Sequence, residues 1–424
     1  MTTPLEWIDE PGRRTPVRRR TQVLVIGAGP AGVAAAVAAA KNGAETLLVE
    51  RHGALGGLAT GGLIALFLTL DDGGGRQVIG GLCQDATERL AARGAAFFPE
   101  KTQWGSDAEA LLDVQRQWGL VWGSPPHRVR YSVAYDPEAL RTVFAEMVIE
   151  SGARLLLHSW ACEAIGDGSR VRGVTFQSKA GRFAVLADVV IDATGDGDIF
   201  ASAGCAHESE TVLPWLWFRV GGVDVERAQA GGAWCFRTVN DGVVLFPWGA
   251  TERAIRKIDA TDPDDLTFAE MECRRLVMEE FERLRREAPG FERAHLCEIA
   301  RDIGITESRR LSGRYMLARD DMDRPLEDAI GLTGHWTRYG ALYWLPYRSL
   351  LAREMDNLLV AGRCISVDHR THHATKEIPS CMVTGQAAGT AAALAVHSAT
   401  APCAIDVNVL RRTLLAQGAL LSPA

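Results

Sequence analysis

The sequence predicts an α/β fold: a parallel sheet flanked by helices, with an antiparallel excursion and a further segment inserted between its strands. Three observations support this prediction. Residues 22–50 have the pattern of strand, glycine turn, helix and second strand, which is a βαβ unit. Patterns typical of buried strands return at 154–158, 188–192 and 357–361. Between about residues 206 and 345 the strand–helix alternation is lost, which indicates a separate structural unit.

The βαβ unit carries a glycine pattern with a physical reason for each position. A β-branched run is followed by Gly27-Ala28-Gly29-Pro30-Ala31-Gly32, and a small-residue helix continues to about residue 42. Gly27 permits the tight turn, Gly29 lets the backbone approach a pyrophosphate, and Gly32 lets the helix pack closely. The helix N-terminus offers N–H groups to phosphate, and Glu50, at the end of the second strand, can accept hydrogen bonds from a ribose. The unit therefore predicts a dinucleotide-binding site.

The segments that follow are predicted from turns and periodicity. Residues 51–63 interleave glycine with Leu and Ala, which predicts backbone running close to a flat ligand and fits a flexible loop poorly. We expect a surface helix at 84–94, an irregular excursion over 95–130, and an antiparallel hairpin over 171–187. Asp136-Pro137 predicts a helix start with Asp as the N-cap.

The inserted segment and the last helix complete the expected architecture. A long helix over about 267–288 is predicted to begin with the capping box formed by Thr267 and Glu270. The last helix, over about 381–396, is rich in small residues, and we expect it to pack closely on the sheet. We assign residues 1–205 and 346–424 to a discontinuous nucleotide-binding domain, and residues 206–345 to an α+β domain that covers the substrate.

Composition disfavours several classes of function. The 424 residues exceed one compact core, and 47% hydrophobic and 23% charged residues are average values. A net charge of −7 gives no reason to expect a nucleic-acid partner. Nine scattered cysteines without a Cys-x-x-Cys pair predict reduced thiols and no metal site. No apolar core follows Arg13-Arg14 and no apolar run could span a bilayer, so we expect a cytoplasmic protein without a membrane span.

A series of motifs spans most of the chain and carries a resemblance to a known family. The motifs are VLVIGAGPAG (23–32), LLVER (47–51), LGGLATGGL (55–63), DATGDGD (192–198), IGITESRRLSGRYML (303–317), LPYRSLL (345–351), NLLVAGRCIS (357–366) and CMVTGQAAGTAAALA (381–395). With them the chain resembles the FAD-dependent oxidoreductases of the glutathione-reductase-like Rossmann superfamily, which are relatives of the fumarate-reductase and thiazole-synthase flavoproteins.

The resemblance implies a glutathione-reductase type of FAD-binding fold with a substrate or cap domain, and FAD as the cofactor. It also implies a set of cofactor contacts that run from the pyrophosphate and ribose to the flavin ring. The last helix would aim its N–H groups at the pyrimidine edge of the flavin and stabilise negative charge there. In chain order the implied contacts are Gly27, Gly29, Pro30, Ala31, Gly32, Glu50, Arg51, Gly57, Leu58, Ala59, Thr60, Ala193, Thr194, Gly195, Gly362, Arg363, Met382 and Val383.

Missing motifs narrow the chemistry within this resemblance. There is no second GxGxxG unit for NAD(P)H, no Cys-x-x-x-x-Cys redox pair, and no Gly-Asp-Ala-Ala-His motif of aromatic hydroxylases. These absences disfavour disulfide reduction and monooxygenation. They favour a two-electron exchange between a small-molecule substrate and the flavin, with oxygen, a quinone or a partner protein as electron acceptor. One departure is Lys376, where the family pattern has an arginine; Lys is a point charge without the planar fork of Arg.

Several side chains are candidates for the chemistry, each beside a structural alternative. Arg309 could clamp a carboxylate or form a domain-interface ion pair, and we weigh the two equally. Tyr339 belongs to an aromatic strip, residues 335–347, that either lines a substrate pocket or packs in the core. His372, His373 and Lys376 lie between the Gly362-Arg363 motif and the last helix, so a histidine there is a candidate general base.

The sequence leaves three functions open. The first is FAD-dependent oxidation of a small organic substrate, and the second is reduction of an activated double bond with external NAD(P)H. The third is a flavin-binding subunit without turnover of its own.

Overall fold

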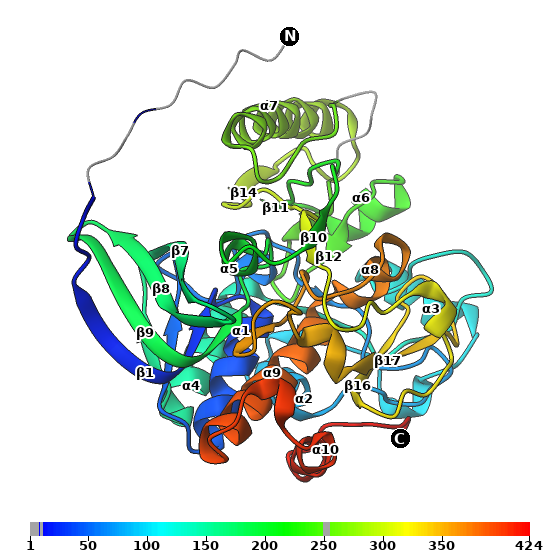
Figure 1. Cartoon of the computed structure of the whole chain (residues 1–424). Helices are drawn as coiled ribbons and strands as arrows, with labels where there is room; N and C mark the ends of the chain where they lie inside the picture. Colours follow the sequence, from blue (N-terminus) through cyan, green and yellow to red (C-terminus); the bar gives the residue numbers. More distant parts are fainter. Residues whose placement is uncertain (1–7, 9–11, 249–254) are drawn as a thin grey trace.

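Figure 1 shows the computed structural model, which describes residue 8 and residues 12–248 and 255–424. Its largest sheet has seven strands in the order β6-β2-β1-β9-β8-β7, with β18 also pairing with β9. The neighbours that pair in parallel are β1 (Val17–Ile26), β2 (Thr46–Val49), β6 (Arg154–Leu156), β9 (Gly181–Asp192) and β18 (Leu358–Val360). The strands β7 (Trp160–Asp167) and β8 (Arg170–Ser178) add the antiparallel excursion. The predicted mixed α/β sheet is therefore confirmed.

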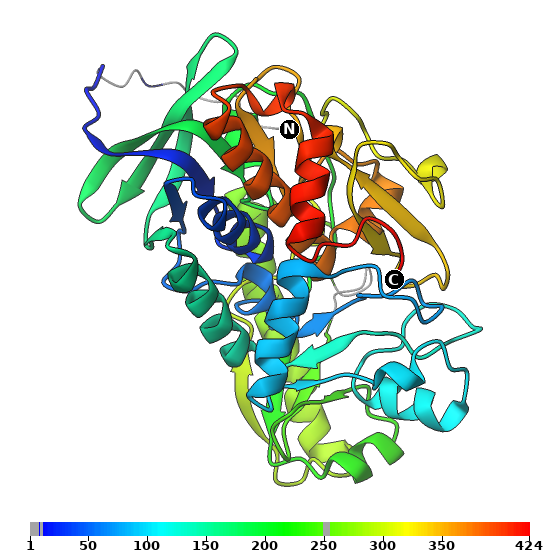
Figure 2. The same ribbon diagram turned by 90° about the horizontal axis from the view of Figure 1, so that it is seen from below.

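Two helices, α1 (Pro30–Lys41) and α9 (Ile378–His397), pack tightly against each other, as Figure 2 shows from below. A Cβ atom added to Gly385 would lie 2.1 Å from the carbonyl oxygen of Ala31, and one added to Gly389 would lie 2.0 Å from that of Ala35. The predicted close approach is confirmed, but its main partner is helix α1 and not the sheet. The helix also begins earlier than predicted, because Pro379 is accommodated in its first turn.

Between residues 206 and 345 the named strands pair antiparallel, which agrees with the predicted loss of strand–helix alternation. Strands β11 (Phe218–Gly221), β12 (Phe236–Arg237), β13 (Val244–Phe246) and β14 (His295–Ile299) form a sheet in the order β12-β13-β11-β14. The helices α6 (Val225–Ala230) and α7 (Pro263–Glu287) lie beside this sheet (Figure 1). Two smaller pairs are β10 (His207–Ser209) with β15 (Arg309–Leu311) and β16 (Ala329–Gly334) with β17 (Leu342–Pro346).

The start of the long helix was also predicted wrongly. Helix α7 begins at Pro263, and the side chain of Asp262 caps it by accepting from the N–H groups of Asp264 and Asp265. Thr267, the predicted N-cap, lies inside the helix and donates its hydroxyl to the carbonyl of Pro263, 2.7 Å away. The Asp-Pro pair is a stronger start signal than the capping box, because it combines an acceptor for free N–H groups with a residue that has none.

The excursion over 95–130 is more regular than predicted. It contains β4 (Ala96–Phe97) and α3 (Glu109–Gln117), and β4 joins β3 (Leu66–Phe67) and β5 (Val133–Tyr135) in a three-stranded sheet. The predicted surface helix is α2 (Gly81–Ala92), and α4 (Pro137–Ser151) begins at the predicted Asp136 cap. The remaining helices are α5 (Asp198–Ser202), α8 (His369–Thr375) and α10 (Val407–Ala416), and the 3-10 turns are Gly57–Ala59, Lys101–Gln103, Arg319–Asp321, Tyr347–Leu350 and Pro402–Ala404. Among the described residues, none of the helices has the length and apolarity needed to cross a bilayer.

Candidate cofactor and substrate site

The glycine turn between β1 and α1 has two closed positions and one open one. Gly27 has φ +93°, and an added Cβ would lie 2.5 Å from the carbonyl oxygen of Ala193. An added Cβ on Gly32 would lie 1.7 Å from the carbonyl oxygen of Gly27. At Gly29 an added Cβ would meet no atom within 4 Å. The turn is therefore packed against the end of β9 on one side and leaves open space beside Gly29.

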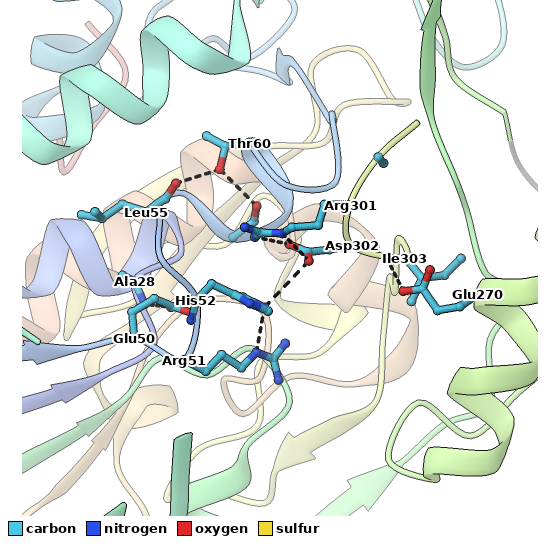
Figure 3. A network of polar contacts seen from close by, with 12 residues as sticks. Ala28, Glu50, Arg51, His52, Leu55, Thr60, Glu270, Arg301, Asp302 and Ile303 are labelled. Atoms are coloured by element: carbon cyan, nitrogen blue, oxygen red, sulfur yellow. Dashed lines mark hydrogen bonds and ion pairs between the residues drawn. The ribbon is translucent and has the colours of Figure 1, made fainter. Parts of the chain in front are cut away.

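Glu50 braces this turn from the end of β2. The carboxylate is buried, with 7% of the residue exposed. Its Oε2 accepts a hydrogen bond from the N–H of Ala28 at 2.7 Å, and Oε1 accepts from the N–H of His52 at 2.8 Å (Figure 3). Sequence reasoning predicted a ribose acceptor here, and the geometry adds that the same carboxylate fixes the backbone of the glycine turn.

The second glycine-rich loop lies against the first. Gly56 has φ +108°, and its N–H donates to the carbonyl of Ala28 at 2.7 Å. An added Cβ on Gly57 would lie 3.2 Å from the Cα of Gly29. The hydroxyl of Thr60 donates to the carbonyl of Leu55 at 2.7 Å and closes the loop (Figure 3). The two loops together form a backbone-lined cradle around the open space at Gly29.

A loop from the segment after residue 205 closes onto this cradle. The N–H of Asp302 donates to the carbonyl of Gly61 at 3.0 Å, and the Asp302 carboxylate lies 3.8 Å from Nε2 of His52. Arg301 pairs with Asp302 at 2.8 Å, and the N–H of Ile303 donates to Glu270 of α7 at 3.2 Å (Figure 3). Burial lowers the pKa of His52, although Asp302 opposes this shift. No local motif in the sequence signalled Arg301 or Asp302 as neighbours of the glycine turn.

Two arginine–aspartate pairs flank the loop after β9. Arg363 bonds Asp196 at 2.7 Å, and Arg309 bonds Asp198 at 2.9 Å. Burial, then the neighbouring carboxylate of Asp196, raises the pKa of Asp198 to about 6. Burial opposes ionisation of Asp196 too, but Arg363 and the hydroxyl of Ser308 hold its pKa below the usual value. In the described part of the chain, Nη1 of Arg363 and Nε of Arg309 are buried donors without a partner.

The start of α9 supplies another unsatisfied group. Ser380 is fully buried in the first turn, and its Oγ has no hydrogen-bond partner among the described residues. Gly362 has φ +87° and donates its N–H to the hydroxyl of Thr384 at 3.0 Å. The open space at Gly29, the unpaired arginine donors and the free N–H groups of this helix start suit an anionic dinucleotide that ends in a flavin. The residues present therefore fit FAD.

The predicted catalytic histidines have different surroundings. His372 is enclosed, with Nε2 at 2.9 Å from the carbonyl oxygen of Arg363, and burial lowers its pKa well below the usual value. His373 is exposed, and its ring centroid lies 4.8 Å from that of Trp336. Desolvation, then the charge of Lys376, lowers the pKa of His373 to about 4. Lys376 bonds Glu377 at 2.6 Å, and its Nζ lies 5.6 Å from the centroid of Trp336. His373, Trp336 and Lys376 thus form one cluster of contacting side chains.

Two other predicted residues are engaged elsewhere. Arg309 is paired with Asp198, as described above, which is the ion-pair alternative that the sequence left open. The ring of Tyr339 lies 3.7 Å from the guanidinium carbon of Arg130, and its hydroxyl donates to the carbonyl of Trp122 at 3.3 Å. In the same aromatic strip, Tyr347 is core: it is buried, and its hydroxyl donates to Pro402. The structure describes no group of three or more His, Cys, Asp or Glu side chains that could hold a metal ion.

The fold and the cradle are those of a dinucleotide-binding protein of the mixed α/β class. The family model described as FAD dependent oxidoreductase matches residues 22–241 and 214–414. The chain belongs to this family of enzymes, and FAD is its cofactor.

The individual proteins that are similar to this chain share only a low sequence identity with it. Digeranylgeranylglycerophospholipid reductases 1 and 2 of Methanopyrus kandleri are each 28% identical to the chain, over 233 and 212 residues. These matches cover 50% and 48% of this chain and 54% and 46% of the relatives, so the chain spans about half the length of the curated relatives it matches. The p-nitrophenol 4-monooxygenase of Pseudomonas putida DLL-E4 is similar in structure, with TM-score 0.52 and 12% identity over 94% of this chain and 85% of that one. At this identity the similarity shows the fold alone.

Proposed function

We propose that the enzyme catalyses a two-electron, hydride-type oxidation of a small organic substrate by FAD, with oxygen, a quinone or a partner protein as electron acceptor. The observation that carries the proposal is the cluster of contacting side chains His373, Trp336 and Lys376. Of these, His373 and Lys376 immediately precede α9 in the chain, and the first turn of α9 contains the unpartnered Ser380. A substrate bound at this cluster would lie near both a candidate base and the proposed flavin-binding helix start.

The cofactor contacts are part of the proposal. Bound FAD supplies the two-electron chemistry, and the chain binds and orients it. We assign the pyrophosphate to the glycine turn and Arg363, the ribose to Glu50 and Arg51, and the ring to the start of α9. Residues 1–205 and 346–424 would form the FAD-binding domain, and residues 206–345 would cover the substrate. The proposed contacts are those implied by the motifs: Gly27, Gly29, Pro30, Ala31, Gly32, Glu50, Arg51, Gly57, Leu58, Ala59, Thr60, Ala193, Thr194, Gly195, Gly362, Arg363, Met382 and Val383.

His373 is the preferred base in this cluster because of its position. Its lowered pKa keeps the imidazole neutral near neutral pH, so a ring nitrogen can accept a hydrogen bond from a substrate hydroxyl or amine. Lys376 would orient the substrate through its charge. His372 is enclosed by protein, and Arg309 and Tyr339 are held by other partners, so we place these three in supporting positions.

A second candidate function is reduction of an activated double bond with external NAD(P)H. The names of the two Methanopyrus relatives, which are reductases, favour it. The two candidates differ in the source of electrons for the flavin.

Anaerobic mixing of the purified yellow protein with NADH or NADPH tests the source of electrons. If the first proposal holds, the flavin band persists with both nucleotides and bleaches with an oxidisable metabolite. Rapid bleaching by a nicotinamide would instead establish the reductase function. His373→Gln should slow bleaching by substrate about 100-fold at unchanged FAD content. His295→Gln, at an exposed position of β14, is the matched control and should keep the normal rate.

A further inference from the structure

A second imidazole, that of His335, lies beside His373 and has no role in the proposal above. His335 follows β16 and is 5% exposed. Its ring centroid lies 5.7 Å from that of His373. Its backbone is fixed on two sides, because its carbonyl accepts from Nη1 of Arg130 at 2.8 Å and its N–H donates to the carbonyl of Ala341 at 3.0 Å. The backbone that carries the ring is therefore held by one distant and one nearby part of the chain.

Thr337 determines which ring nitrogen of His335 carries the proton. The backbone N–H of Thr337 points at Nδ1 of His335 at 3.3 Å, and the Thr337 hydroxyl lies 3.2 Å from the same atom. A backbone N–H can only donate, so Nδ1 must be the unprotonated acceptor. The neutral ring then carries its hydrogen on Nε2. Among the described residues, neither Nε2 of His335 nor either ring nitrogen of His373 has a hydrogen-bond partner.

The surroundings of the two rings favour their neutral forms. Burial, then His373, Arg338 and Arg130, lowers the pKa of His335 to about 4. Desolvation, then the charges of Lys376 and Arg338, lowers the pKa of His373 as well, and the imidazole of His369 adds to this shift. Near neutral pH the pair thus consists of one fixed N–H donor, on His335, and one imidazole free to accept a proton, on His373.

We propose that His335 is a substrate-contacting residue, whose Nε2–H binds a carbonyl or hydroxyl oxygen on the reacting part of the substrate. This inference rests on the proposed function and narrows its substrate class to organic molecules that carry such an oxygen. A neutral, preorganised donor stabilises an oxygen that gains negative charge during the reaction, because no reorientation is needed at that moment. Trp336, which contacts His373, provides an apolar wall for the body of the same molecule.

A purely structural histidine is the alternative. Such a residue would use Nδ1 to hold the turn, as His335 does, but its Nε2–H would have no function. The proposal gives this N–H a partner, the substrate oxygen, and so accounts for both nitrogens of the ring.

Binding of p-hydroxybenzaldehyde to the oxidised holoenzyme tests the assignment without turnover. The near-ultraviolet spectrum of this probe reports whether its phenol is ionised. A hydrogen bond from His335 to the phenol oxygen should favour the bound phenolate, so the apparent pKa of the bound probe should fall below its value in water. His335→Phe should weaken binding about tenfold and restore the ordinary pKa of the probe. His335→Gln keeps a side-chain N–H and should recover part of both effects.

The controls separate this inference from the proposed function. His397→Phe, at the far end of α9, should leave probe binding unchanged. FAD content and the flavin spectrum of each variant report whether the site is intact. Two outcomes would overturn the inference: wild-type enzyme that does not bind the probe, or His335→Phe that binds and ionises it as well as wild type. Neither outcome affects reduction of the flavin by substrate, which tests the proposed function alone.

Discussion

The glycine turn at residues 27–32 and the turn at residues 335–340 build their sites in opposite ways. In the first, the brace from Glu50 to Ala28 joins residues 22 positions apart within one βαβ unit. In the second, the bond from Arg130 to His335 joins residues 205 positions apart. The proposed cofactor site is therefore specified by local spacing, whereas the proposed substrate site depends on the packing of distant segments. Mutations should separate these two kinds of site.

The largest effect is expected at the glycine turn. Gly32→Ala would place its Cβ 1.7 Å from the carbonyl oxygen of Gly27, so backbone must move. We expect a loss of at least about 3 kcal/mol in the free energy of unfolding, or no folded protein. Gly29→Val points into open space and has an extended backbone, so this variant should fold, yet block the approach of a pyrophosphate.

Flavin content and circular dichroism distinguish the two glycine variants. Gly29→Val should give a colourless protein with a normal far-ultraviolet spectrum and at least about 100-fold weaker FAD binding. A yellow Gly29→Val protein would show that the open space beside Gly29 is not the pyrophosphate site. That result would also contradict the view that local sequence spacing specifies the cofactor site.

The next largest effect is a loss of stability at low pH, where His335 becomes protonated. Its pKa in the folded protein is about 4, against 6.5 for an unperturbed histidine, so the unfolded chain binds the proton more readily. Its contribution to stability is therefore fully present above about pH 6.5 and is lost as pH falls towards 4, by up to about 3 kcal/mol. Urea unfolding at about pH 7 and about pH 4.5 measures this loss. His335→Phe should flatten the pH dependence, and an unchanged slope would show that His335 is not buried as a neutral group.

Arg363 lies between the two proposed sites. Its side chain pairs with Asp196, and its backbone carbonyl accepts a hydrogen bond from Nε2 of His372. Arg363→Lys keeps the charge beside Asp196 but removes the planar fork and the unpaired Nη1. We expect about tenfold weaker FAD binding, measured by quenching of flavin fluorescence as apoprotein is added. Arg314→Lys, in a partly exposed pair with Asp356, is the control and should bind FAD normally. Equal affinities for all three proteins would remove Arg363 from the cofactor site.

The same contrast explains what the sequence could predict. Gly27, Gly32 and the strand that ends at Glu50 lie where the pattern placed them, because strand, turn and helix signals act over a few residues. Asp302 reaches Gly61 and Arg130 reaches His335 only after the chain has folded, and no local pattern encodes such contacts. His335 itself was visible as part of an aromatic strip, but its fixed tautomer depends on the turn geometry at Thr337.

The smallest effect is expected in helix α7, where the sequence predicted the wrong N-cap residue. The Asp262 side chain accepts from two N–H groups in the first turn, whereas the Thr267 hydroxyl bonds a carbonyl inside the helix. Asp262→Ala should therefore cost about 1 kcal/mol in the free energy of unfolding, while Thr267→Ala should change it by less than about 0.5 kcal/mol. Urea denaturation of both variants gives the comparison. A larger loss for Thr267→Ala would mean that the helix in solution starts at the capping box, and that local spacing was the better guide even in this segment.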